Sequence, residues 1–118
     1  MQIESARTFF EALAARAQEP RLANAIGTLE LDVAGSGTWT VTVDRGAVRV
    51  AERPLPPDIE APTRIHIRED ELVRLLRGED NQNLVTALLR GALVLDGDLR
   101  VLQLLQAIIP IPKDWGMA

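Results

Sequence analysis

Apolar and polar positions alternate at two different periods along the chain. Over residues 4–18 the apolar side chains return every three or four positions, which is the spacing of one helical face. Phe9, Phe10 and Leu13 lie on this apolar stripe, and Ser5 stands where a helix N-cap is expected. We therefore predict an amphipathic N-terminal helix that buries this stripe.

Residues 28–51 change to strict alternation of apolar and polar side chains, which is the period of a strand. The glycine-containing segments 35–37 and 44–46 divide this region into three runs and are typical of hairpin turns. We predict a three-stranded antiparallel meander with Trp39 on its apolar side. Because the other side is polar, we expect the sheet to be covered on one side only.

The second half of the chain combines short strands and helices. A proline-rich connector over residues 52–62 leads to a strand in which His66 stands between two isoleucines. Helical spacing then predicts two short helices, which end at Gly78 and Gly91. A fifth strand follows at Leu93 and Leu95, and a last helix, apolar almost all round, runs from residue 99 to Ile109.

This order of elements predicts an α+β fold in a single domain over residues 1–118. We expect a twisted, mostly antiparallel five-stranded sheet with helices covering one face. The fifth strand follows a long helical excursion, so it can join its neighbour in either direction. The last helix is so apolar that it must either fill the interior or face a partner, a lipid or a second copy.

Composition excludes several classes of protein. The net charge is −4, with no block of basic residues, so no nucleic-acid footprint is present. Cysteine is absent, which excludes disulfides and thiolate metal sites. No apolar run is long enough for a transmembrane segment, and residues 1–4 do not begin a signal peptide, so we expect a cytoplasmic protein. Aromatic residues are only 3%, so the interior must be mostly aliphatic.

The candidates for catalysis are weak. His66 is the single histidine, and its alternation with isoleucine favours a solvated strand residue. Ser36 lies in a turn between strands without the spacing of a nucleophile elbow. Asp96 and Asp98 flank a turn glycine, where a turn and an N-cap explain them better than a metal site. We therefore expect a protein that is not an enzyme and needs no cofactor and no metal.

The element order and several local patterns resemble the sterol carrier protein 2 (SCP2) family over most of the chain. The resemblance lies in Phe9-Phe10, in residues 37–46, in Ile65-His66-Ile67, and most specifically in residues 89–99, which fit a G-x-L-x-x-x-G-D-L pattern. It implies an SCP2-like fold with an internal apolar tunnel. It also implies non-catalytic binding and carriage of a fatty acid, a fatty acyl-CoA, a sterol-like lipid or a polyprenyl lipid.

The residues expected to line such a tunnel are apolar and come from the helices and the second strand. They are Phe9, Phe10, Leu13, Trp39, Leu72, Leu76, Leu88, Leu102, Leu105 and Ile109. Lining and ordinary core use the same residue types, so both interpretations stay open for each. Trp115 follows two prolines and can either fold over a tunnel mouth or stay mobile.

Two further hypotheses about partners stay open. An accessory or scaffold protein in lipid or ubiquinone biosynthesis would act through a partner enzyme or through a homodimer, with the C-terminal helix as the contact. A lipid carrier would also make transient contact with a membrane.

Overall fold

The computed structural model describes residues 4–16, 18–59, 62–79 and 83–109. Five strands, four α-helices and one 3-10 turn make up the fold. In chain order they are α1 (Ala6–Arg16), η1 (Pro20–Leu22), β1 (Ile26–Ala34), β2 (Gly37–Asp44), β3 (Ala47–Ala51), β4 (Thr63–Arg68), α2 (Glu69–Arg77), α3 (Leu84–Arg90), β5 (Leu93–Asp96) and α4 (Val101–Gln106). The α+β prediction is confirmed, and η1 is the one described element that the sequence did not indicate.

The strands form one mixed sheet in the order β3-β2-β1-β4-β5. The meander β1-β2-β3 is antiparallel, as predicted, and β5 joins β4 antiparallel. Only β1 and β4 run parallel, in a register that places Leu29 opposite Thr63. This register leaves the first three residues of β1, Ile26 to Thr28, without β4 beside them. The exposed start of β1 becomes one wall of a groove described below.

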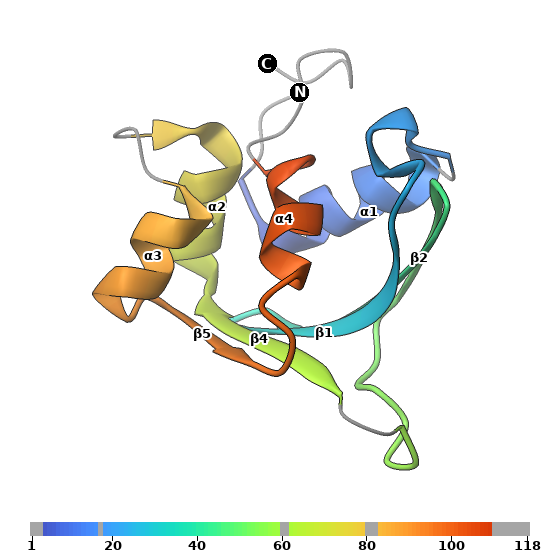
Figure 1. Cartoon of the computed structure of the whole chain (residues 1–118). Coiled ribbons are helices and arrows are strands. Elements are labelled where there is room, and N and C mark those ends of the chain that lie inside the picture. Colours follow the sequence, from blue (N-terminus) through green and yellow to red (C-terminus); the bar gives the residue numbers. More distant parts are fainter. Residues whose placement is uncertain (1–3, 17, 60–61, 80–82, 110–118) are drawn as a thin grey trace.

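The four helices all pack on one face of the sheet (Figure 1). The apolar stripe of α1 and the inward side chains of the strands form a single core, in which Phe9, Phe10, Leu13 and Trp39 are fully buried. The rings of Phe10 and Trp39 stack with centroids 4.5 Å apart. Burial of such large apolar side chains is the main source of stability in a domain of this size.

Local sequence explains where the helices begin and end. The Ser5 hydroxyl accepts the Thr8 N–H at 3.2 Å, which confirms the predicted N-cap of α1. The Glu69 carboxylate, from the first turn of α2, accepts the Ala6 N–H at 3.0 Å and joins the starts of α1 and α2. Gly78 and Gly91 end their helices in the left-handed conformation, at φ 70° and 77°.

The last helix is shorter than predicted. The prediction from residue 99 to Ile109 is wrong at both ends, because α4 spans only Val101–Gln106. At its start, the Asp98 carboxylate accepts the Arg100 N–H at 2.9 Å and holds a separate turn before the helix. Beyond Gln106 the chain tightens, and the Ile108 N–H bonds the Leu105 carbonyl three residues back. The helix is also buried on one side only, not on most sides.

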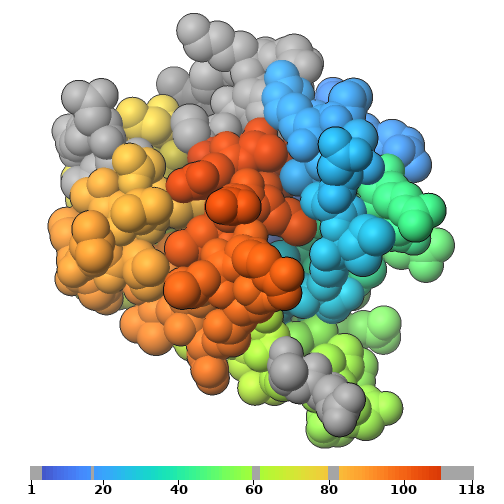
Figure 2. Space-filling model, viewed as in Figure 1, coloured from blue at the N-terminus to red at the C-terminus, as the bar shows by residue number. Residues whose placement is uncertain are grey.

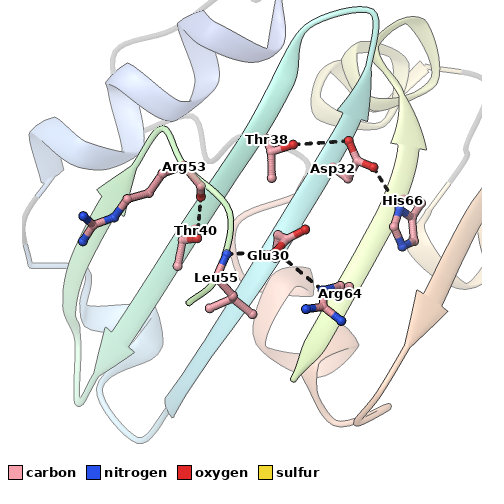
Figure 3. A network of polar contacts seen from close by, with 8 residues as sticks. All are labelled: Glu30, Asp32, Thr38, Thr40, Arg53, Leu55, Arg64 and His66. Carbon is pink, nitrogen blue, oxygen red and sulfur yellow. Dashed lines mark hydrogen bonds and ion pairs between the residues drawn. The ribbon is translucent and has the colours of Figure 1, made fainter. Parts of the chain in front are cut away.

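The polar face of the sheet is partly covered, contrary to the expectation of a bare face. The connector after β3 crosses this face (Figure 3). The Glu30 carboxylate, buried there, accepts the Leu55 N–H at 2.9 Å and lies 3.5 Å from the Arg64 guanidinium. The Thr40 hydroxyl donates to the Arg53 carbonyl at 2.7 Å. Glu30 and Thr40, which the alternation predicted to face solvent, thus hold the connector through hydrogen bonds to its backbone.

Candidate functional site

A groove of about 500 Å³ runs between α4 and the segment that joins η1 to β1. Figure 2 shows α4 on the surface, with α3 on one side of it and the start of β1 on the other. Val101, Leu104 and Ala107 lie three residues apart and form the α4 wall, while Leu22 and Ile26 belong to the opposite wall. The groove lies where the first residues of β1 extend beyond the end of β4, with α4 on its other side.

Polar groups gather along the rim of the groove. The lining includes Arg21, Asn24, Thr28, Thr63, Asp98, Arg100 and Gln103. Asp98 and Arg100 form an ion pair at 2.7 Å on this rim. Hydrogen bonding to the Arg100 guanidinium lowers the pKa of the Asp98 carboxyl, and the same bond raises the pKa of Arg100. The groove is therefore lined by fixed opposite charges as well as by aliphatic side chains.

One glycine allows the rim to pack closely on the sheet. Gly97 has φ 129°, and a Cβ built on it would lie 2.8 Å from Thr63 Cα and 2.9 Å from the Pro62 carbonyl. No side chain fits there. The turn therefore rests directly on the start of β4, where the Asp98 N–H donates to the Thr63 hydroxyl at 3.3 Å. This close contact fixes the position from which α4 begins.

A buried carboxylate holds the opposite wall. Glu19 is fully buried and accepts the Arg21 N–H at 3.1 Å as the N-cap of η1. The Arg16 and Arg21 guanidinium groups lie 3.2 and 2.9 Å from its oxygens. Because both arginines neutralise a charge that would otherwise be costly to bury, they fix the path from the end of α1 to the start of β1.

The residues predicted to line a tunnel lie elsewhere in the molecule. Nine of the ten are buried in the main core, and Leu88 is partly buried against it. None of the ten lines the groove or either of two further cavities at the described residues. The structure brings them together in one apolar interior beneath the helices. Whether lipid enters between them stays a prediction, and Trp115 lies outside the described residues.

The groove residues were missed because their pattern is weak in the sequence. Val101, Leu104 and Ala107 share the spacing of one helical face, and this spacing is the one feature of the sequence that could have indicated a groove wall. In the sequence they could not be told from Leu102 and Leu105, which point into the core. The opposite wall comes from residues 21–28, so only tertiary contact could reveal it.

The candidate catalytic residues lie on the polar face of the sheet. His66 Nδ1 is 3.1 Å from the Asp32 carboxylate, which stands directly opposite on β1 (Figure 3). The sequence did not indicate this pair, because Asp32 and His66 are 34 positions apart in the chain. Both side chains of the pair are nearly half exposed. Ser36 lies in the β1-β2 turn, and within the described part of the chain Asp32 is the sole polar partner of the imidazole.

The described residues contain neither a candidate metal site nor a helix able to span a membrane. Among these residues, no three histidine, aspartate or glutamate side chains come close enough to hold a metal ion. None of the described helices combines the length and the apolar character needed to cross a bilayer.

Comparison with solved structures identifies related folds at low sequence identity. A sec-alkylsulfatase from Pseudomonas sp. matches with a TM-score of 0.68 and 20% identity, over 86% of this chain but only 16% of the sulfatase. A structure titled "UbiJ-SCP2 Ubiquinone synthesis protein" matches with a TM-score of 0.58 and 21% identity, over 82% of this chain and 81% of that one. At such identity, these matches establish the fold alone. The chain spans about a sixth of the sulfatase.

An N-acetyltransferase from Kribbella flavida also matches, with a TM-score of 0.50 and 22% identity, over 81% of this chain and 23% of the acetyltransferase. Among curated proteins, no sequence matches the chain. The model of the SCP-2 sterol transfer family matches residues 9–110, which is most of the chain. The protein with this sheet, these four helices and this groove therefore belongs to the SCP-2 sterol transfer family.

Proposed function

We propose that the protein binds a long-chain hydrophobic ligand without covalent chemistry and carries it with the hydrocarbon chain along α4. The groove between α4 and the start of β1 is the observation that carries this proposal. Its volume of about 500 Å³ is within the range of small-molecule sites. Val101, Leu104 and Ala107 supply aliphatic surface on the α4 side, and polar lining residues such as Gln103 and Arg100 supply hydrogen-bonding groups for a polar end group.

The ligand class follows from the chemistry of the walls. Aliphatic side chains bind an alkyl or isoprenoid chain through burial, at about 0.8 kcal/mol per methylene before the costs of ordering. The three aromatic side chains described, Phe9, Phe10 and Trp39, are buried in the core and away from the groove. A fatty acid, a fatty acyl-CoA, a sterol-like or a polyprenyl lipid fits such walls better than a flat aromatic ligand.

The predicted tunnel residues supply a second, deeper place for the chain. Leu102 and Leu105 lie on the inner side of α4, behind the groove, and contact the common core. Outward movement of this six-residue helix exposes Leu102 and Leu105 at a cost of about 1.5–3 kcal/mol each, which burial of about four to eight ligand methylenes offsets at about 0.8 kcal/mol each. In the proposed function, α4 moves outward when a ligand binds. The ligand chain then enters from the groove between the ten residues predicted to line a tunnel.

We expect no chemical change in the ligand. The Asp32–His66 pair lies on the polar face of the sheet, whereas the helices, α4 included, cover the other face. An imidazole that acts on a bound acyl group would need to reach it within hydrogen-bonding distance. The sheet itself separates the two.

A second candidate function is an accessory role in ubiquinone synthesis. The observation in its favour is that the UbiJ-SCP2 structure matches over 81% of its own length and thus has nearly the same extent as this chain. In that role the ligand would be polyprenylated, and the protein would present it to a partner enzyme.

The test is ligand uptake by variants of α4. Native mass spectrometry of protein purified without detergent, followed by titration with cis-parinaric acid and with a polyprenyl alcohol, measures uptake directly. Leu104→Trp fills the groove and should weaken uptake about tenfold or more. Gln106→Trp adds the same side chain at an exposed position of the same helix that does not line the groove and serves as the control. Equal uptake by both variants, or no uptake by the unmodified protein, would refute the proposal.

A further inference from the structure

A second cavity, of about 320 Å³, lies where β1 and β4 end. Ala34 and Arg68 are the last residues of these two strands and stand opposite each other in the register. Glu71, from the first turn of α2, and Gly91, at the end of α3, also line it. We call it the strand-end cavity. It shares no lining residue with the groove, so the function proposed above does not use it.

The walls of the strand-end cavity combine open space with a small apolar surface. A Cβ built on Gly91 meets no atom within 4 Å, so the end of α3 leaves room on this side. Ala34 and Ala92 contribute small side chains, and Ile67 is the largest apolar residue of the lining. The volume is at the lower end of the range for small-molecule sites, and the apolar surface suits a short aliphatic chain.

Two of the three charged residues that line the strand-end cavity are paired with residues outside the lining. The Arg68 guanidinium lies 2.6 Å from the Asp70 carboxylate. The Glu71 carboxylate lies 3.1 Å from the Arg90 guanidinium. An anionic ligand would therefore compete with Asp70 for Arg68, which disfavours an anion in this cavity.

The third charged residue, Asp32, has partners that leave its negative charge uncompensated. One carboxylate oxygen accepts the Thr38 hydroxyl at 3.4 Å, and the other lies 3.1 Å from His66 Nδ1. In a neutral imidazole, the nitrogen that faces a carboxylate carries the proton, so both partners are uncharged donors. A carboxylate offers about four lone-pair sites, and these two bonds use two of them. Asp32 can therefore accept further N–H donors.

We propose that the strand-end cavity binds a primary ammonium group on a short aliphatic chain. The ammonium donates to the Asp32 carboxylate, and its charge compensates the one charge of the lining that the described residues leave unmatched. The aliphatic chain lies against Ala34, Ile67 and Ala92. Binding at this end of the sheet is a property separate from lipid carriage, because the groove has its own walls.

The test is an NMR titration of the isotope-labelled protein with n-butylammonium at mildly alkaline pH. The amide signals of Ala34, Gly91 and Ala92 should shift and saturate. Butyltrimethylammonium keeps the charge but has no N–H donor, and butyrate reverses the charge. Both should bind about tenfold more weakly or less, because neither donates a charged hydrogen bond to Asp32.

Asp32→Asn should weaken binding of n-butylammonium about tenfold or more, because the amide carries no charge. Asp44→Asn is the matched control, since it changes the net charge equally at an exposed residue of β2 that does not line the cavity. Its binding should be unchanged. Circular dichroism melts of both variants establish that they are folded.

Several outcomes would overturn the ammonium site. One is the absence of saturable shifts in the unmodified protein, and another is equal binding of butyrate or butyltrimethylammonium. A third is an equal loss of binding in Asp32→Asn and Asp44→Asn, which would assign the effect to net charge alone.

A parallel titration with cis-parinaric acid separates this proposal from the proposed function. Uptake of cis-parinaric acid without binding of n-butylammonium would reject the ammonium site and leave the carrier function standing. Binding of n-butylammonium without uptake would reject the carrier function and leave the ammonium site standing.

Discussion

Replacement of Gly97 by alanine should destabilise the protein far more than the same change at Gly91. Both glycines have positive φ, 129° and 77° respectively. At Gly91 an added Cβ meets nothing within 4 Å, whereas at Gly97 it meets Thr63 Cα at 2.8 Å and the Pro62 carbonyl at 2.9 Å. Both variants place a side chain at positive φ, but at Gly97 the backbone conformation is less favourable and a steric clash is added.

The magnitudes follow from these geometries. An alanine in the left-handed region costs about 1 kcal/mol, which is the expected loss for Gly91→Ala. At Gly97 the conformation costs an L-residue up to about 3 kcal/mol, and overpacking against backbone adds about 1–3 kcal/mol. We expect Gly97→Ala to lose at least about 3 kcal/mol. In a chain of 118 residues this loss lowers the melting temperature by roughly 12 °C, against about 4 °C for Gly91→Ala.

Urea unfolding followed by circular dichroism measures both free energies, with thermal melts as a second measure. Because the 97–98 turn sets the start of α4, Gly97→Ala should also weaken ligand uptake, and Gly91→Ala should not. Equal losses of stability in the two variants would refute the claim that close contact with β4, rather than backbone conformation alone, requires glycine at position 97.

Two further predictions concern charged side chains. Glu30→Ala leaves a buried connector N–H without an acceptor and should lower the free energy of unfolding by about 1–3 kcal/mol, whereas Glu52→Ala, which removes an exposed ion-pair partner, should have no measurable effect in the same urea titration. The pKa of Asp98 is lowered by its hydrogen bond to Arg100, so its stabilising contribution is complete above the unfolded-state value of about 3.9 and is lost as pH falls through the lowered folded-state pKa. Arg100→Gln should raise the Asp98 pKa toward that value in a carboxyl NMR titration, and an unchanged pKa would contradict the assignment.

Local patterns were sufficient to predict most elements of this fold. The helical stripe of Phe9, Phe10 and Leu13, the alternation around Trp39 and the hairpin turns depend on neighbouring residues only, and the structure confirms all three. The glycine that ends α2 was recognised for the same reason, because left-handed conformation is a local requirement. Such features are encoded within a few positions of one another.

Predictions failed or were incomplete where two distant segments meet. Alternation placed Glu30 outside the sheet, but the connector buries it. The contact between His66 and Asp32 joins two strands that are distant in sequence, and no local pattern indicated it. The groove has walls from residues 21–28 and 98–107, so neither segment alone indicates it.

The sequence by itself determined the type and order of the elements and the family to which the chain belongs, because these depend on periodicity, turn residues and local motifs. Tertiary structure decided that β1 lies parallel to β4, that α4 stops at Gln106 and that a groove opens beside it. The physical reason is that strand neighbours and helix ends are selected by packing against the whole core, and apolar residues such as Leu102 and Leu104 acquire different roles only from what surrounds them.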